Sequence, residues 1–388
     1  MNYNRTVKND STVTVRVACA VVFVAFAFLW LFFFQADLIS VAQHVFSAGQ
    51  TIYYPLTGAL LITAILLLLQ SGIFWLLRLG KFSHALTYLP SFLVLAVITS
   101  AGEHAGSHFA LGRWLWLAPL LLILWGALVW VARSLVPYEA RHATGLFSRC
   151  VWFNMLAMAV MMAGVACSAN TNAVFHFRIH AERALISRDY DEALSVGSRS
   201  LETDASLTMI RAYALARKGM LGERLFHYPV YPSSDAILPA AGDAGSRMLI
   251  YPADSVYRFL GAVPRRPMQP QEYLAAIKRS GQAAPAADDY ILCSSLIDKD
   301  LDSFARQIVS CRTVNDSLPR HYREALVLYN HLRSNPLIVY HDPVLDADYD
   351  DLQRLKAEYK VYDERKGKAL ELYRNSYWYY YEFVNNKQ

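Results

Sequence analysis

The sequence predicts an all-α protein in which a bundle of five transmembrane helices precedes a water-soluble helical domain. Of its 388 residues, 55% are hydrophobic and 18% are charged, and the mean hydropathy is +0.21. This apolar content exceeds that of ordinary soluble proteins. The charges are also segregated, because residues 1–174 hold only 9 of the 37 Lys and Arg and 4 of the 32 Asp and Glu. Five apolar stretches in this first part complete the prediction of an integral membrane protein.

A helix that crosses a bilayer needs about 20 apolar residues at about 1.5 Å each, and the five stretches meet or approach this length. The third stretch is the shortest and contains Pro90, which is tolerated near a helix end because neighbouring groups satisfy the freed carbonyl. If this stretch were re-entrant, the number of spans would be even. The expected spans are residues 17–34, 56–77, 85–100, 114–132 and 151–174, and together they define a transmembrane domain over residues 1–174.

Flanking charges predict the orientation, because Lys and Arg near span ends remain on the cytoplasmic side. Eight such residues lie before the first span and in the second and fourth loops, whereas the other two loops contribute only Arg113. We therefore expect a multi-pass protein of the cytoplasmic (inner) membrane with a cytoplasmic N-terminus and an extracytoplasmic or periplasmic C-terminal domain. The alternative for the first stretch is a signal peptide cleaved near Ser40-Val41-Ala42, although the apolar run is longer than a signal peptide needs.

The charge pattern also excludes function classes. The middle of each expected span lacks Asp, Glu, Lys and Arg, the residues that mark ion-coupled transport paths, so a transporter is disfavoured. Residues 175–388 contain 28 basic and 28 acidic residues, without the positive excess that nucleic-acid binding requires. The expected partners are therefore the lipid bilayer and an extracytoplasmic protein or peptide, with no nucleic acid.

Residues 175–228 have a helix–turn–helix rhythm. The segment Arg188-Asp189-Tyr190-Asp191-Glu192-Ala193-Leu194 resembles the turn and second-helix start of a tetratricopeptide repeat (TPR), with Ala193 where paired helices touch. Gly197 and Ala205 depart from the repeat consensus, which has a large aromatic residue and a proline there. The resemblance implies a TPR-like helical array with a concave surface suited to protein or peptide binding.

The remaining chain is predicted to contain a linker and a second helical block. Tyr228-Pro229-Val230-Tyr231-Pro232 ends the first unit, because two closely spaced prolines prevent a helix. Residues 229–270 are rich in Pro, Gly and Ala and are expected to form an irregular surface linker. Helical patterning returns over residues 271–388, where Asp298-Lys299-Asp300 is the turn of a helical hairpin.

The two expected outer loops contain the candidate catalytic residues Asp37, Glu103, His104 and His108. A His pair at i, i+4 with a carboxylate can bind zinc on a helix, but two nearby glycines oppose a helix here. We therefore expect no metal and no cofactor. These residues support only an alternative hypothesis of enzymatic activity.

Two cysteines, Cys293 and Cys311, fall in the domain that is expected to lie outside the cytoplasm, where a disulfide could form. They flank the turn at Lys299 at unequal distances, which puts them out of register on paired helices. The sequence leaves their pairing open.

The C-terminal segment is unusually aromatic. Tyr377, Trp378, Tyr380 and Tyr381 are candidate partner-binding residues, or residues that dock at a membrane interface. The competing interpretation is a terminal helix that packs in the domain's own groove, because helical arrays need a cap.

The whole chain resembles an uncharacterised family of bacterial polytopic membrane proteins that end in a TPR-like region. The resemblance is carried by RDYDEAL at 188–194, RAYALARKGMLGERLFHYPV at 211–230 and the Tyr- and Trp-rich end. It implies an architecture but no activity. The leading hypothesis is a non-catalytic, membrane-anchored extracytoplasmic helical-repeat scaffold that binds another envelope protein or peptide. The alternative is an enzyme of envelope glycan or lipid assembly with an outer-face Asp, Glu and His site.

Overall fold

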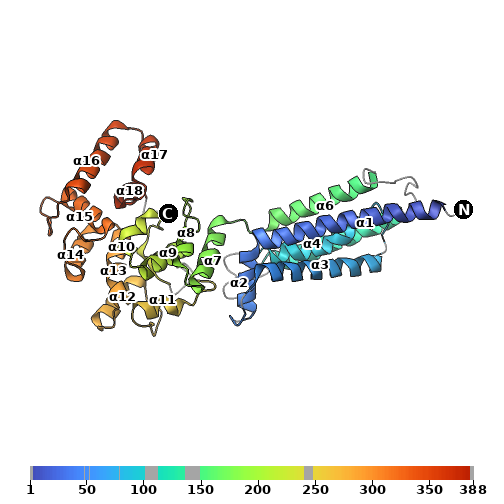
Figure 1. Cartoon of the computed structure of the whole chain (residues 1–388), viewed down its shortest axis with the longest axis horizontal. Coiled ribbons are helices and arrows are strands. Elements are labelled where there is room, and N and C mark those ends of the chain that lie inside the picture. The colour runs from blue at the N-terminus through green and yellow to red at the C-terminus, as the bar shows by residue number, and fades with distance from the viewer. Residues whose placement is uncertain are drawn as a thin grey trace. The chain divides into compact units, whose positions relative to one another are not determined.

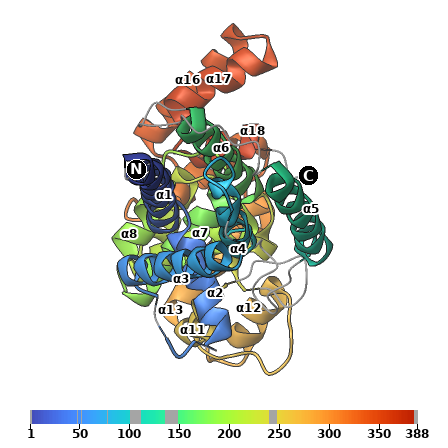
Figure 2. The same ribbon diagram turned by 90° about the vertical axis from the view of Figure 1, so that its right-hand side faces the viewer.

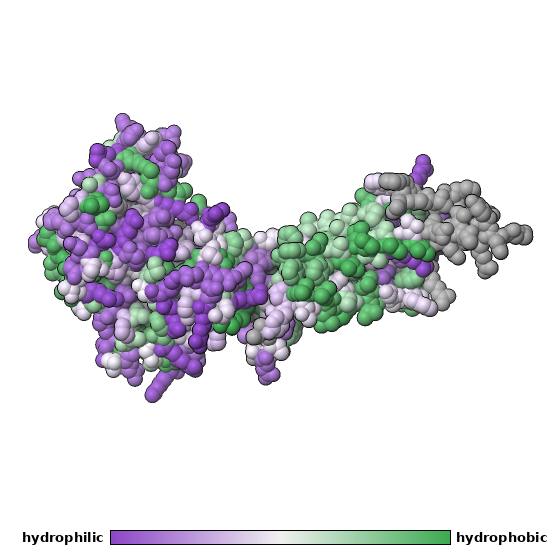
Figure 3. Space-filling model, viewed as in Figure 1, coloured by the Kyte–Doolittle hydropathy of each residue, from purple (hydrophilic) through white to green (hydrophobic). Residues whose placement is uncertain are grey.

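The computed structural model describes residues 3–47, 49–51, 53–77, 79–100, 112–135, 149–239 and 248–384, and every regular element in these ranges is helical. The chain divides into two compact units, Met1–Asn172 and Ala173–Gln388 (Figure 1). Hydrophobic surface covers the helices of the first unit, whereas the surface of the second is largely hydrophilic (Figure 3). The division lies two residues before the expected boundary at 174.

The first unit contains four helical segments that are long and apolar enough to cross a membrane: Val13–Phe34, Pro55–Leu77, Trp114–Ser134 and Arg149–Ser168. Each coincides with an expected span, although the last ends at Ser168 rather than at 174. The elements of this unit are α1 (Tyr3–Leu29), η1 (Trp30–Phe34), α2 (Ala36–Phe46), α3 (Pro55–Leu77), η2 (His84–Tyr88), α4 (Leu89–Ile98), α5 (Trp114–Leu135) and α6 (Arg149–Ser168).

The expected third span, residues 85–100, forms a shorter element. It begins with the five-residue η2 and continues as the ten-residue α4. At about 1.5 Å per residue this segment extends roughly 22 Å, less than the roughly 30 Å of a bilayer core. It lies deep in the bundle, with Phe92 and Leu95 buried against neighbouring helices. The described residues thus provide four helices of spanning length and a short central one.

Buried polar side chains join this short segment to its neighbours. The Asn154 side chain of α6 accepts a hydrogen bond from the Ala85 amide at 2.7 Å and donates one to the Lys81 carbonyl at 2.8 Å. Gln70 of α3 donates to Thr87 at 3.0 Å. Such bonds satisfy groups that would be costly to leave unpaired in a bilayer.

Among the described residues, helix α5 has few partners within the first unit. It stands to one side of α1, α3, α4 and α6 (Figure 2). Only 6% of its most apolar 18-residue stretch is buried. Two side-chain bonds hold it: Trp125 donates to the Leu86 carbonyl at 2.8 Å and Arg133 to the Leu77 carbonyl at 2.7 Å.

The second unit is built of helices around one continuous hydrophobic core that extends from Ala181 to Phe383. Its elements are α7 (Ala173–Ile186), α8 (Tyr190–Ser195), α9 (Ala205–Arg217), α10 (Leu221–Arg224), η5 (Leu225–His227), η6 (Ser234–Ile237), α11 (Ala253–Leu260), α12 (Pro270–Arg279), α13 (Pro285–Ile297), α14 (Leu301–Cys311), α15 (Arg320–Leu332), α16 (Pro343–Glu358), α17 (Tyr362–Tyr373) and α18 (Tyr377–Phe383).

The two expected hairpin turns have the same local design. Arg188 and Lys299 each adopt a left-handed conformation with φ 60°. The aspartate that follows each, Asp189 or Asp300, caps the next helix by accepting a backbone amide hydrogen bond at 2.9 Å. Because both the turn and the cap are local, a short sequence motif is enough to specify them.

The helical pair that begins the second unit packs as small residues allow, because Ala181 and Ala193 are fully buried. However, α8 is only six residues long. Gly197, which replaces the consensus aromatic residue, has φ +61°, and a Cβ atom there would lie 2.7 Å from the Phe177 ring. Gly197 therefore lies in a sharp turn just after α8, where a residue with a side chain would be strained and would clash with Phe177.

The prediction of an irregular surface linker at 229–270 is wrong in part. This segment contains η6 and α11, and it contributes Ile237, Leu238 and Val256 to the buried core. The hydrophobic positions of α11 recur at helical spacing, which composition alone concealed.

A buried carboxylate holds part of this segment. Glu182 of α7 is completely buried and accepts the amide hydrogens of Leu249, Ile250 and Tyr251 at 2.8, 2.6 and 3.0 Å. Burial raises the pKa of Glu182, while the nearby Arg178 and the three amides favour the charged form. The segment is therefore fixed by a side chain almost seventy residues earlier in the chain.

Candidate functional site

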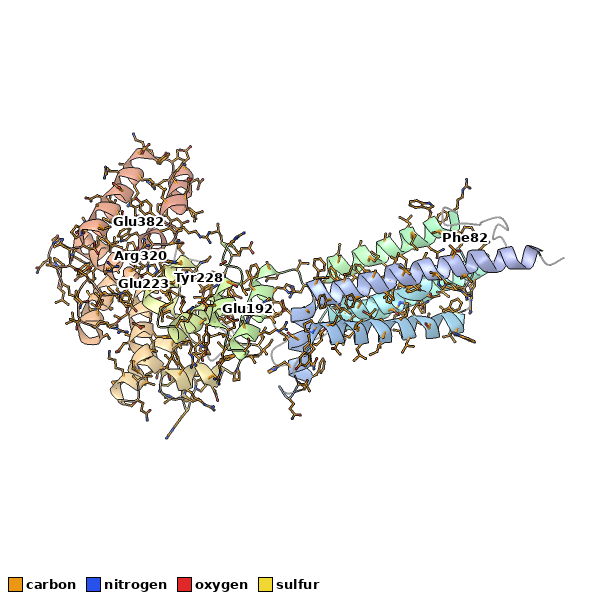
Figure 4. All side chains as sticks on the ribbon, viewed as in Figure 1. Phe82, Glu192, Glu223, Tyr228, Arg320 and Glu382 are labelled. Atoms are coloured by element: carbon orange, nitrogen blue, oxygen red, sulfur yellow. The ribbon has the colours of Figure 1, made fainter. Side chains whose placement is uncertain are left out.

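A cleft of about 1080 Å³ opens in the second unit and is the candidate functional site. Its lining comes from residues within 201–205, 226–236 and 366–384, together with Asp298. Both aromatic and charged side chains contribute. Tyr228, labelled in Figure 4, belongs to the second of these segments.

The Tyr-Pro-Val-Tyr-Pro segment forms one wall because its prolines keep the backbone out of a helix. Val230 is buried, whereas Tyr228 and Tyr231 remain partly exposed along the cleft. The Tyr231 amide donates to the Thr208 hydroxyl of α9 at 3.0 Å. The segment is thus an extended strip, anchored to α9, that presents tyrosine and proline side chains.

A buried arginine supports this wall. Arg211 is 1% exposed, and its guanidinium lies 5.2 Å from the centre of the Tyr228 ring. It donates to the carbonyls of Val196 and Gly197 at 3.3 and 3.2 Å, while its Nε and Nη1 have no hydrogen-bond partner among the described residues. Burial lowers the pKa of Arg211 to about 10, so the group is still charged at neutral pH. The Tyr228 ring therefore covers a positive charge.

The opposite wall is formed by α18. Tyr379, Tyr380 and Phe383 line the cleft, and the Tyr380 hydroxyl donates to the Ile297 carbonyl at 2.7 Å. The Phe226 ring centre lies 4.8 Å from that of Tyr380, so the two walls meet at an aromatic contact. Aromatic side chains thus pack to form the floor of the cleft.

Charged residues of both signs occur in the cleft. Asp298 accepts the Ser234 amide at 2.9 Å and the Gln271 side chain at 2.8 Å, so its carboxylate is already engaged. Glu202, Asp235 and Lys366 are exposed. The rim can therefore pair with either charge on a ligand.

A buried Glu–His pair lies beneath the cleft and is structural. His321 Nδ1 lies 2.9 Å from the Glu324 carboxylate, an arrangement that elsewhere orients a catalytic base. Here the Phe226 amide donates to the other ring nitrogen at 3.3 Å, so the proton resides on Nδ1 and neither nitrogen is available to a substrate. Both side chains are completely buried.

Glu324 has further donors. It accepts the Tyr377 amide at 2.7 Å and the Arg320 guanidinium at 2.8 Å. Although burial raises it, the pKa of Glu324 lies below its ordinary value, because His321, the Tyr377 amide and Arg320 favour the charged form. Nearby, the Arg320 amide donates to Glu223 of α10 at 2.6 Å, and both residues are labelled in Figure 4.

Of the four candidate catalytic residues, only Asp37 lies among the described residues. Asp37 lies half-buried in the first turn of α2. Glu103, His104 and His108 lie outside the residues that the structure describes. Within the described part of the chain, no group of three or more His, Cys, Asp or Glu could hold a metal ion.

The prediction that the aromatic C-terminal residues bind a partner is wrong for Tyr377 and Trp378. Tyr377, Trp378 and Tyr380 are at most 4% exposed, and only Tyr381 is partly accessible. The Trp378 indole donates to the Glu324 carbonyl at 2.8 Å, and the Tyr377 hydroxyl to the Leu296 carbonyl at 3.2 Å. Burial and internal bonding exclude Tyr377 and Trp378 as partner-binding residues in this fold, because a partner could not reach them, whereas Tyr380 forms part of the cleft wall.

The two cysteines of the second unit are both free. Cys293 is buried beside the Tyr322 hydroxyl at 3.5 Å, and Cys311 is partly exposed beside Lys278. Cys293 and Cys311 therefore do not form a disulfide in this structure.

Comparison with known proteins gives one match. Residues 265–384, from just before α12 through α18, match a family described as a family of unknown function (DUF6057). The match agrees with the expected resemblance to an uncharacterised family and covers under a third of the chain. No curated protein and no solved structure matches the chain significantly.

Sequence reasoning missed the cleft, although a signal was present. Tyr228-Pro229-Val230-Tyr231-Pro232 was interpreted only as the end of a helical unit, yet it forms one wall. Two tyrosines beside two prolines are typical of extended segments with an accessible aromatic face. The other wall, α18, lies almost 150 residues later; its aromatic residues attract attention in the sequence, but no local signal pairs them with the Tyr-Pro segment.

Replacing Glu324 tests the structural assignment. We expect Glu324→Gln to lower the stability of the second unit by about 3 kcal/mol, because a buried cluster of donors loses its charged acceptor. Protease-resistance midpoints of the full chain in detergent measure this. The control is Glu371→Gln, an exposed residue paired with Lys368, which should change stability by less than about 0.5 kcal/mol. Equal effects would contradict the assignment.

The pH dependence of stability tests His227. Burial, together with His321, Arg224 and Arg320, lowers the pKa of His227 to about 4, with only Glu324 opposing. The pKa of an imidazole in the unfolded chain is about 6.5. Below that pH the unfolded chain binds a proton that folded His227 does not bind. The free energy of unfolding therefore decreases as pH falls from about 6.5 to 4. We expect His227→Gln to lose less stability over this range in the same protease assay. Identical pH profiles would show that another group is responsible.

Proposed function

We propose that the chain is a membrane-anchored, non-catalytic binding protein whose helical second unit binds an extended segment of another envelope protein. The observation that carries this proposal is the cleft with its wall of tyrosine and proline side chains. The TPR-like, extracytoplasmic scaffold expected from the sequence agrees with this function.

The chemistry of the cleft favours binding over catalysis. His227, with its pKa near 4, is a weak base. The Asp298 carboxylate is occupied by Ser234 and Gln271, and the buried pair of His321 and Glu324 is closed to ligands. General acid–base catalysis requires a group whose pKa suits the operating pH and that reaches the substrate.

The shape and lining favour an extended polypeptide. Aromatic grooves bind proline-rich and other extended segments, because ring faces pack on a backbone that has already lost much of its conformational freedom. Tyr228, Tyr231 and Tyr379 supply such faces, and Glu202, Asp235 and Lys366 supply charges for flanking residues. A floor that is already packed in the unbound chain reduces the side-chain ordering that binding requires.

The anchoring part of the proposal rests on the first unit. Four helices of spanning length support insertion in a membrane. If the short η2–α4 segment also crosses, in a locally thinned bilayer, five spans and the flanking Lys and Arg would place the second unit outside the cytoplasm. With four spans it would share the cytoplasmic side with the N-terminus.

Thiol labelling distinguishes these topologies. A Lys368→Cys substitution in a background that carries Cys167→Ser and Cys311→Ser places a thiol at an exposed position of α17. We expect a membrane-impermeant maleimide to label this thiol in intact spheroplasts, because the second unit faces outward. A Ser11→Cys variant, near the cytoplasmic N-terminus, should be labelled only after lysis. Labelling of both variants only after lysis would overturn the extracytoplasmic placement.

Site-specific crosslinking tests the binding function. A photoreactive phenylalanine analogue at Tyr231, which is 39% exposed, should capture one recurrent segment of an envelope protein in cells. The same analogue at Val339, exposed outside the cleft, is the control and should not capture it. Mass spectrometry of the linked peptides identifies the segment.

A synthetic peptide of the captured segment completes the test. We expect it to bind the detergent-solubilised full chain, and Tyr231→Ala to weaken binding about tenfold, or about 1.4 kcal/mol, because one stacking face is lost. Val339→Ala should have no effect. An unchanged affinity in Tyr231→Ala, or crosslinks confined to the chain itself, would contradict the proposed function.

A further inference from the structure

An amine, a thiol and a carboxylate lie within hydrogen-bond distance of one another at the ends of three helices, away from the cleft. Lys278 lies in the last turn of α12, Cys311 ends α14, and Asp288 lies in the first turn of α13. The Lys278 ammonium is 2.9 Å from the Cys311 sulfur and 3.0 Å from the Asp288 carboxylate. The sulfur in turn lies 3.4 Å from the same carboxylate oxygen. The three groups therefore form a closed triangle.

The triangle is accessible to a small solute. The side chains of Lys278 and Asp288 are 41% and 32% exposed, and Cys311 is partly exposed beside a shallow hollow formed by residues 309–314. By contrast, Cys293 is completely buried. Oxidation of cysteine follows exposure and the presence of a nearby cation, so Cys311 is the reactive thiol of the second unit.

We propose that Lys278 and Cys311 form a peroxide-induced covalent sulfur–nitrogen crosslink that joins the C-terminal ends of α12 and α14. The distance between the two atoms carries this proposal, because a nitrogen at 2.9 Å can intercept an oxidised sulfur before other thiols reach it. Sulfenic acids condense with nearby nitrogen nucleophiles to give sulfenamides. The inference does not depend on the function of the cleft.

The reaction balances with hydrogen peroxide as the oxidant. Asp288 takes the thiol proton and passes it to solvent, and the sulfur attacks one peroxide oxygen, which breaks the O–O bond. The Lys278 ammonium protonates the departing hydroxide, so one water and a neutral amine result. The amine then attacks the sulfenic sulfur and an S–N bond forms as the S–O bond breaks. The departing hydroxide takes one hydrogen from the nitrogen and leaves as a second water. Sulfur loses two electrons, and the peroxide is reduced to two waters.

The geometry gives each residue a separate role. Lys278 supplies both the proton that assists O–O cleavage and the nitrogen that captures sulfur. Asp288 positions the ammonium and removes the thiol proton. The crosslink closes a loop between residues 33 positions apart, which restricts the unfolded chain and stabilises the fold against heat.

Mass spectrometry of the full chain in detergent tests the proposal. The protein is reduced, freed of reductant, treated with hydrogen peroxide and digested. We expect a linked pair of peptides containing Lys278 and Cys311, lighter than their sum by two hydrogen atoms, which dithiothreitol separates again. The thermal midpoint of the treated protein should rise and should return after reduction.

Two variants and one internal control make the result decisive. Cys311→Ser should abolish the linked peptides. Lys278→Arg keeps the positive charge but should lose the crosslink, so Cys311 should advance to sulfinic acid instead. Cys293 should remain reduced throughout, because it is buried. The proposal is overturned if Cys311 reaches sulfinic acid at the same rate in the wild type and in Lys278→Arg, with no linked peptides in either.

Discussion

The packing of the second unit depends on the hydrogen bonds that the buried Glu324 carboxylate accepts. The carboxylate joins helix α15, which carries it, to the first turn of α18 through the Tyr377 amide, and through His321 it reaches the Phe226 amide after α10. These partners are 53 and 95 residues away from the bonded side chains. A charge in an apolar interior is costly unless hydrogen-bond donors surround it, so releasing either Tyr377 or His321 from Glu324 would be unfavourable.

The candidate cleft is a consequence of this arrangement. Its two walls are the segment after Phe226 and helix α18, and both are positioned by the same carboxylate. The aromatic rings that pack between the walls exclude water from the network, and the network keeps the rings in register. Stability and binding geometry are therefore coupled: a change beneath the cleft that releases Tyr377 or Phe226 would also move the surface that a ligand meets.

The two units solve the problem of buried polar groups in different ways. In the first unit the apolar helices bond internally, and a few amide and hydroxyl side chains, such as Asn154 and Gln70, bridge them. In the second unit, buried carboxylates gather backbone amides from distant segments, as Glu182 does at residues 249–251. This second solution allows irregular segments to belong to the core, and it explains why the described residues 229–239 and 248–270 include irregular stretches that contribute buried side chains.

The sequence by itself determined the features that depend on composition or on a few neighbouring residues. Of the five apolar stretches predicted as spans, four coincide with helices of spanning length, and an aspartate just after Arg188 or Lys299 specifies each hairpin turn. Only the tertiary structure decided that the 85–100 stretch is a short buried helix, that Tyr377 and Trp378 are internal, and that Tyr231 lines a cleft opposite α18. The physical reason is range: caps and hydropathy act within a few residues, whereas burial depends on contacts between segments that the chain brings together only on folding.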